Sequence, residues 1–436
     1  MEKKIGLAAL ISIVIGSQVG SGVFMLPQLL APYSVFALIG WCVSGFGALS
    51  LAMVFMGLVK RLPKTGGPHA YVQEAFGQSA AFFIGWTYWL VSSLSSATVI
   101  AATISYLTPI INIKSPYVFA AHELFLLGIV TIINLRGVKS ASFVEMALNV
   151  IKMITLLVIP MAGLYFFDSG NITFNTSIIN QQPPISLISQ TAVLTLWAFI
   201  GVEAATTPAE TVKNPKYTIP AAILIGTCCV LALYLINSIS FIGLTTPTEL
   251  AATKTPYVLA TQKIFGGNWH LIIAGFAALV CVSNLNAWIL TSGQIALGVA
   301  NDNLLPSVFK RKNRYDAPSF ALLTTAFVIV IPILLTIDDD ISKQVFAIID
   351  LSVQASVLIY LLCCASFFKI LQNEKKVWHH YENIITIIAM LFCIAMMASA
   401  QIKTVLLASL FFASGLPIYA LWLRKQPVFN KRHTHN

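Results

Sequence analysis

Long apolar runs alternate with short polar segments along the whole chain. Twelve runs are long enough to cross a bilayer as helices, each of which needs about 20 apolar residues. They lie near residues 5–31, 35–58, 81–108, 117–135, 144–167, 186–210, 220–245, 270–299, 319–337, 345–368, 384–401 and 404–423. This pattern predicts an all-α polytopic membrane protein with 12 transmembrane helices. The first run is too long for a cleaved signal peptide, so we expect it to remain as the first span.

Small and polar residues interrupt the first run at its middle depth. Ser17 and Gln18 precede Gly20, Ser21 and Gly22 there, and glycine and serine let the backbone leave helical geometry. Peptide groups freed in hydrocarbon are stable only where they line a cavity or meet a polar ligand. A broken span therefore indicates a binding site at the membrane centre. The alternative is a close contact between two helices, which also uses small residues.

The sixth run is interrupted in the same way, because Gly201 and Glu203 lie in its middle. Two interrupted spans five apart are typical of an inverted repeat of five plus five spans, with the site between the halves. We therefore expect a first repeat at 1–167, a second at 186–368, two further spans within 384–423, and a cytoplasmic tail at 424–436.

Composition and charge agree with a membrane protein. The 436 residues are 57% hydrophobic and 10% charged, with a mean hydropathy of +0.83, whereas soluble domains carry about 25% charged residues. Of the 26 Lys and Arg residues, 20 lie in alternate loops and in the two tails. This asymmetry predicts cytoplasmic termini, and it explains the net charge of +10 without a nucleic-acid partner. The seven cysteines lie in apolar runs without zinc-ligand spacing, so we expect buried thiols and no metal site.

Two ionisable side chains lie deep in the predicted spans. A carboxylate at the bilayer centre costs about 2.5 kcal/mol or more, so we expect Glu203 to face a cavity as a proton carrier or pH sensor. Lys152 lies about 8 residues, roughly 12 Å, into the fifth span. We expect its ammonium to meet the unwound backbone of the first span and to take part in proton coupling. The alternatives are a structural acid held by a neighbouring helix and a lysine that reaches the interface.

Aromatic and hydroxyl side chains add to the candidate cavity. Tyr88, Trp197 and Trp288 lie away from the interfaces where such rings usually anchor, so they either gate a cavity and stack on a cation or simply pack. A strip of serines in the third span either lines the cavity or bonds to other helices, the second being commoner: Ser92, Ser93, Ser95 and Ser96. The apolar spans contain no nucleophile elbow, phosphate-binding loop or metalloprotease motif, so we expect no enzyme and no cofactor.

Four segments together resemble the amino acid–polyamine–organocation transporters. The first segment is Gly20-Ser21-Gly22-Val23-Phe24-Met25-Leu26-Pro27, in the first span. The second comprises Leu196-Trp197-Ala198-Phe199-Ile200-Gly201-Val202-Glu203-Ala204 of the sixth span and Val212-Lys213-Asn214-Pro215-Lys216 in the loop that follows. The others are Thr65-Gly66-Gly67-Pro68-His69-Ala70-Tyr71 and Asp302-Asn303-Leu304-Leu305-Pro306. The likeness covers nearly the whole chain. It extends to the bacterial arginine–agmatine and putrescine–ornithine antiporters, with Tyr88, Trp197, Glu203 and Trp288 at matching places.

The resemblance implies a leucine-transporter-type fold in which spans one and six are discontinuous. The substrate carboxylate would meet the Ser21 hydroxyl and the Gly22 amide at a half-helix N-terminus. The α-amino group would meet the carbonyls of Gln18, Trp197 and Ile200. The implied substrate-binding set is Ser17, Gln18, Gly20, Ser21, Gly22, Tyr88, Ser92, Ser96, Trp197, Ile200 and Trp288.

The resemblance also implies roles in coupling and gating. Trp288 would stack on a cationic side chain, Trp197 would act as a gate, and Glu203 would be the pH-sensitive carboxylate. We therefore expect a secondary active transporter in the inner membrane, embedded in the lipid bilayer. It would exchange cationic amino acids such as arginine or ornithine, or their amines, by alternating access. Whether it forms a homodimer stays open.

Four residues keep a second function open. Ser17, Gln18 and Ser96 differ from the residues that arginine antiporters carry at the matching places, so the side-chain pocket is reshaped. Lys152 resembles the fifth-span lysine of proton-coupled relatives. The alternative is therefore a proton-coupled permease for neutral amino acids. A channel or a membrane enzyme is a weaker expectation.

Overall fold

A computed structural model describes residues 6–63, 67–113, 115–172, 182–203, 206, 212–335, 337, 341–374 and 380–422, with the backbone alone at residues 9, 21, 138–151, 341–344, 346, 347 and 422. The regular structure in these residues is helical. The helices are α1 Leu7–Gln18, α2 Ser21–Leu30, α3 Val35–Arg61, α4 Pro68–Phe76, α5 Gln78–Ile111, α6 Pro116–Leu135, α7 Val138–Tyr165, α9 Pro184–Trp197, α10 Pro215–Leu244, α11 Pro247–Ala252, α12 Pro256–Phe265, α13 Trp269–Asn301, α14 Ser319–Leu335, α15 Ile341–Asn373, α16 His380–Ala398, α17 Ile402–Ala413 and α18 Leu416–Trp422. Short 3-10 helices occur at η1 Ala31–Tyr33, η2 Ser169–Asn171 and η5 Ser307–Lys310.

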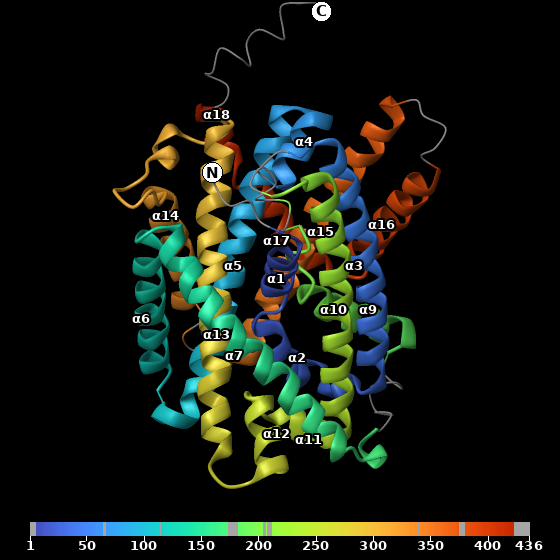
Figure 1. Ribbon diagram of the computed structural model, residues 1–436, viewed down its shortest axis with the longest axis vertical. Helices are drawn as coiled ribbons and strands as arrows, with labels where there is room; N and C mark the ends of the chain where they lie inside the picture. The colour runs from blue at the N-terminus through green and yellow to red at the C-terminus, as the bar shows by residue number, and fades with distance from the viewer. Residues whose placement is uncertain are drawn as a thin grey trace, which may run out of the picture.

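The long helices surround a short, broken central pair. In Figure 1, α1 and α2 lie one below the other near the middle of the bundle, with α5 and α13 on one side and α3 and α10 on the other. The helix α13 packs against α5 and α7, and α10 packs against α1 and α3. The residues that interrupt the first apolar run therefore lie inside the bundle, and the surrounding helices separate them from its outer surface.

The apolar helices fit a polytopic membrane protein. Nine helical segments of the described chain are long and apolar enough to cross a membrane: α1–α2, α3, α5, α6, α10, α13, α15, α16 and α17–α18. Shorter apolar helices in α7, α9 and α14 overlap the fifth, sixth and ninth predicted spans. The apolar runs were therefore predicted in the right places, while a count of twelve spans stays a prediction. The short helices α4, α11 and α12 lie between the predicted spans, where their few turns gave no long apolar signal.

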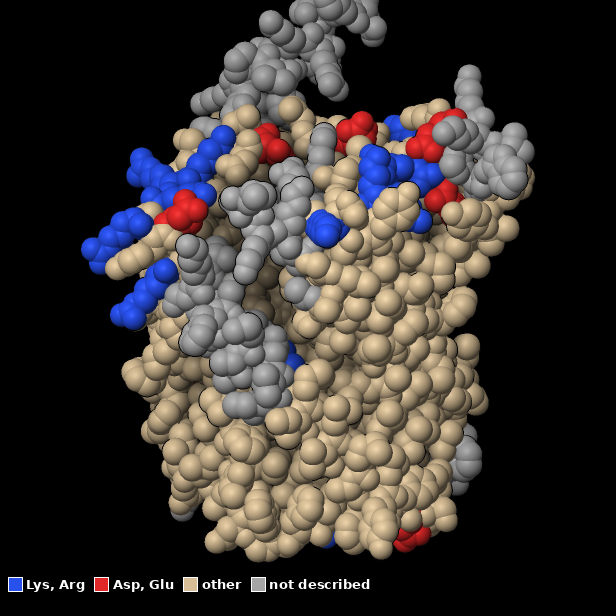
Figure 2. Space-filling view, viewed as in Figure 1, with Lys and Arg blue, Asp and Glu red and all other residues tan. Residues whose placement is uncertain are grey.

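Charged side chains gather at one end of the molecule. Figure 2 shows most Lys and Arg side chains at the upper end, where α4 and α18 lie in Figure 1, above a broad belt of uncharged surface. Among the basic residues, Lys60 lies in the last turn of α3, Lys369 lies near the end of α15, and Lys310 and Arg311 lie at the end of η5. A belt free of charge is what contact with the hydrocarbon of a bilayer requires.

The first and sixth spans are broken where the sequence predicted. The helix α1 ends at Gln18, Gly20 is extended with φ −125° and ψ −150°, and α2 begins at Ser21. The helix α9 ends at Trp197, and residues 198–203 form turns in which Gly201 has φ +105°. Only glycine adopts that φ without strain, so Gly201 allows this break.

The cysteine prediction was correct for only part of the set. Cys281, Cys363, Cys364 and Cys393 are buried, but three are exposed on the outer faces of α3 and α10: Cys42, Cys228 and Cys229. An apolar run does not imply burial in the protein, because lipid tails cover the outer face of a membrane helix as well as another helix would.

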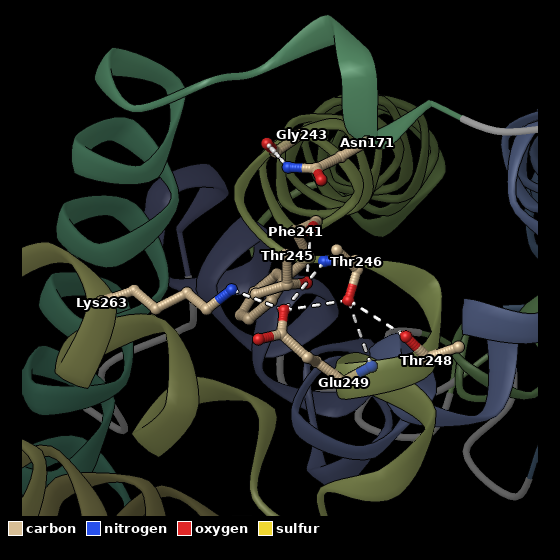
Figure 3. A network of polar contacts seen from close by, with 8 residues as sticks. All are labelled: Asn171, Phe241, Gly243, Thr245, Thr246, Thr248, Glu249 and Lys263. Carbon is tan, nitrogen blue, oxygen red and sulfur yellow. Dashed lines mark hydrogen bonds and ion pairs between the residues drawn. The ribbon is translucent and has the colours of Figure 1, made fainter.

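Two short helices close the end of the bundle opposite α4. The helix α11 begins with a capping box formed by Thr246 and Glu249, and both α11 and α12 pack against α2. Figure 3 shows the Glu249 carboxylate between Thr246 and Lys263 of α12, with Oε2 2.6 Å from Lys263 Nζ and 2.9 Å from Thr246 Oγ1. The hydrogen bond from Lys263, and then those from Thr246, hold the pKa of Glu249 below its ordinary value.

We expect the Glu249–Lys263 pair to make a small, pH-dependent contribution to stability. Since the folded-state pKa of Glu249 is lowered, the contribution is present above about pH 5 and is lost as the pH falls through that lowered pKa. Both side chains are partly exposed, so Glu249→Gln should cost about 0.5 kcal/mol or less. Thermal unfolding in detergent at neutral and strongly acidic pH measures this. A loss that persists in a Lys263→Met background would contradict the pair as its source.

Candidate functional site

The two chain breaks contact each other. The Ser17 hydroxyl lies 2.9 Å from the Val14 carbonyl oxygen and 3.2 Å from the Gly201 carbonyl oxygen, so it joins the end of α1 to the break after α9. A Cβ atom at Gly201 would lie 3.2 Å from the Ser17 carbonyl oxygen. Glycine at position 201 therefore provides both the left-handed backbone and the space for this approach.

The helix α10 holds both breaks from the side. The Tyr234 hydroxyl lies 2.8 Å from the Gln18 carbonyl oxygen and 3.2 Å from the Ala198 carbonyl oxygen. The Gln18 side chain donates from Nε2 to the Thr227 hydroxyl, at 3.1 Å. Peptide groups that the two broken helices leave without helical partners thus find partners on one intact helix, as a low-dielectric interior requires.

A small cavity, partly open to solvent, lies between the breaks and the helices α5 and α13. Its lining residues include no charged side chain: Ser17, Gln18, Gly20, Gly22, Ser95, Val99, Trp197, Ala198, Ile200, Asn284 and Trp288. Within the described part of the chain, two buried amide atoms at this cavity lack a hydrogen-bond partner, Gln18 Oε1 and Asn284 Nδ2.

Seven of the eleven expected binding residues line this cavity, namely Ser17, Gln18, Gly20, Gly22, Trp197, Ile200 and Trp288. The side chain of Ser21 lies outside the described residues. The other three do not line the cavity: Tyr88, Ser92 and Ser96. The Gly22 position is close to Trp197, since a Cβ there would lie 3.2 Å from the indole ring.

The serines of α5 lie in different surroundings. Ser92 accepts a hydrogen bond from Ser292 of α13 at 2.8 Å, and Ser96 donates to the Ser92 carbonyl at 2.9 Å. Ser95 and Val99 line the cavity instead. Consecutive helical residues point about 100° apart, so Ser95 faces the cavity when Ser96 does not. The bonds between helices that the sequence left as the commoner alternative are those of Ser92.

Sequence reasoning also missed Asn284. It is 2% exposed in α13, one turn before Trp288, and its side chain packs on the break in the first span. A Cβ at Gly20 would lie 2.5 Å from both terminal atoms of the Asn284 amide. The available signal was an amide in the middle of an apolar run, spaced to share a helix face with Trp288.

The carboxylate of Glu203 is fully buried beside the second break, close to the cavity but outside its lining. Its two oxygens accept hydrogen bonds from the hydroxyls of Tyr88 at 2.6 Å and Tyr360 at 2.7 Å. The Gly201 amide in turn donates to the Tyr360 hydroxyl, at 3.4 Å. Tyr88 of α5 therefore holds one oxygen of the Glu203 carboxylate. Tyr360 of α15, which the sequence did not single out, holds the other.

Lys152 is buried, so the alternative that its side chain reaches the membrane interface was wrong. Its side chain is 1% exposed, and Nζ donates to the Gly16 carbonyl oxygen at 3.3 Å. Gly16 belongs to the last turn of α1, where carbonyl groups lack helical partners and carry partial negative charge. A cation is stable at such a helix end, and the two buried ionisable groups thus lie beside different breaks.

Comparison of the sequence with known proteins shows the family to which the chain belongs. The model of the amino acid permease family matches residues 5–423, so the chain belongs to this family of the amino acid–polyamine–organocation superfamily. Over 421 residues it is 26% identical to the putrescine transporter PotE of Haemophilus influenzae, which covers 96% of this chain and 97% of the relative. Over 447 residues it is 28% identical to the cadaverine/lysine antiporter of Escherichia coli K12, covering 100% and 97%. PotE of Escherichia coli K12 is 25% identical over 445 residues, covering 100% and 99%. The protein is a multi-pass inner-membrane transporter rather than an enzyme.

Glu203→Gln should flatten the pH dependence of transport more than it weakens substrate binding. A glutamine keeps the shape but cannot change charge, and it offers only one acceptor to the two tyrosine hydroxyls. Transport rates measured from acidic to neutral pH should then vary by less than about twofold, while affinity falls by about tenfold or less. Glu123→Gln, which alters another buried carboxylate, in α6, is the matched control. An unchanged pH profile in Glu203→Gln would count against this role.

Proposed function

We propose that this protein is a secondary active transporter that exchanges cationic amino acids, such as lysine, arginine or ornithine, for one another or for their decarboxylated amines by alternating access. The substrate would sit in the cavity between the two breaks. The observation that carries the proposal is the contact of Ser17 with Gly201, because it brings two interrupted spans together at one cavity without a charged lining residue.

The chemistry of the cavity suits a zwitterion with a cationic side chain. The first turn of α2 presents backbone N–H groups and the positive end of a helix dipole to a carboxylate near Gly22. The backbone carbonyl groups at Trp197 and Ile200, which line the cavity, would accept hydrogen bonds from the substrate ammonium group. Since no acid lines the cavity, the side-chain cation would be held by the indole face of Trp288, with Trp197 closing the site.

The architecture proposed for this function is an inverted repeat of residues 1–167 and 186–368, with one broken span in each half. The halves would rock against each other around the fixed site. The basic end of the molecule would face the cytoplasm together with both termini, because Lys and Arg favour that side of a membrane.

Exchange in proteoliposomes tests the function. One relative is a cadaverine/lysine antiporter and another is a putrescine transporter. Lysine, cadaverine and putrescine are therefore tested together with arginine and ornithine. We expect uptake of labelled lysine or arginine only into liposomes loaded with an amino acid or amine of this group. Uptake that saturates and matches efflux one for one also excludes a channel. Failure of every loaded substrate to drive uptake would overturn the proposal.

A second candidate is a proton-coupled permease for neutral amino acids. It is favoured by the buried Lys152 ammonium at the Gly16 carbonyl, since a lysine there could lose its proton as α1 moves. Neutral amino acid uptake into empty liposomes, driven by a pH gradient alone and abolished by Lys152→Met, would establish this function in place of exchange.

Trp288→Leu should weaken cationic substrates selectively. A cation held over a desolvated indole loses about 1–2 kcal/mol when the ring is removed, which is about a 5- to 30-fold loss of affinity. Competition for uptake measures the affinities of lysine and of an uncharged amino acid of similar length. An equal loss for both would mean that Trp288 only packs.

A further inference from the structure

Asn284 has no function in the site as described so far, although it contributes an amide to the cavity wall. It is 2% exposed, and its buried Nδ2 atom has no hydrogen-bond partner among the described residues. The amide nitrogens of other buried residues do donate: Asn134 to Asn286 at 3.0 Å, Asn237 to the Leu233 carbonyl at 2.8 Å, and Gln18 to Thr227 at 3.1 Å. A buried amide without a protein partner at a cavity indicates that a ligand supplies the partner.

The position of this amide indicates which ligand group it meets. Its terminal atoms lie against Gly20, the residue that caps the N-terminus of the ten-residue helix α2 without a side-chain hydrogen bond. The free N–H groups and the dipole at this end favour a negative charge. The Lys152 ammonium, held at Gly16, adds positive potential to the same break. An amide can turn to present either end, and beside a positive potential its N–H end faces an anion.

We propose that the Asn284 amide donates a hydrogen bond to the carboxylate of a bound amino acid, and thereby distinguishes an amino acid from the amine formed by its decarboxylation. This inference rests on the proposed function. A diamine has no carboxylate, so it leaves the buried Asn284 donor unpaired and the positive end of α2 without a counter-charge. A site built to bond a polar group discriminates against analogues that lack the group.

The preference has a consequence for exchange. Amino acid and amine share the ammonium end that Trp288 would hold, so the two ligands differ mainly at the α2 end of the cavity. Asn284 would then set the ratio of their affinities, while Trp288 would set the affinity of both.

The test is competition binding in detergent, with lysine and cadaverine as probes, because binding does not depend on the transport cycle. Asn284→Ala should lower lysine affinity about tenfold and change cadaverine affinity less than about twofold, since only lysine loses a bond. The isosteric Asn284→Asp places a negative charge at the same atoms. It should weaken lysine further and strengthen cadaverine, which reverses the preference between the two ligands.

Ser283→Ala is the matched control, because its buried hydroxyl lies next to Asn284 on α13, lacks a partner among the described residues and does not line the cavity. It should leave the lysine-to-cadaverine ratio unchanged. Equal losses for lysine and cadaverine in both Asn284 variants would overturn this inference alone, provided that the wild type still exchanges amino acids. A loss confined to cadaverine would overturn it too. A wild type that binds neither ligand would overturn both this inference and the proposed function.

Discussion

The structure depends on the need of every peptide group in a membrane interior to find a partner. Two spans stop being helical in the middle of the bundle, and the groups that they release are taken up by one another and by α10. The Ser17 hydroxyl reaches the Gly201 carbonyl, and the Tyr234 hydroxyl lies between carbonyls of the two breaks. The breaks therefore stabilise each other, and neither would be tolerated alone in hydrocarbon.

The same constraint explains where the buried charges lie. Lys152 bonds to Gly16 at the end of α1, and Glu203 follows Gly201 and accepts bonds from two tyrosines. The hydrogen bonds described for these two groups run to a backbone carbonyl for Lys152 and come from two tyrosine hydroxyls for Glu203. A rearrangement of either break would change the surroundings of one charge. In the proposed transporter, this is a physical route by which protonation and the movement of the halves influence each other.

Because the cavity wall carries no charged side chain, the groups that would bind every substrate differ from those that would distinguish one substrate from another. In the proposed transporter, backbone groups and indole faces would accept any amino acid or amine of suitable size. Selection between such ligands falls to a few side chains that present one polar group each, such as Ser95 and Asn284. The relatives at 25–28% identity are named for different substrates, putrescine in two cases and cadaverine with lysine in the third.

The sequence by itself located the apolar helices, the two breaks and the two buried charges. Long apolar runs have few alternatives to membrane helices, and glycine, serine and charge in mid-membrane have few uses. The tertiary structure alone decided which side chains reach the cavity. Ser95 replaces Ser96, Tyr88 turns to Glu203, and Tyr234, Tyr360 and Asn284 join from other helices. Helices that are apolar all round carry no amphipathic signal for their rotation, which is fixed only by packing against their neighbours.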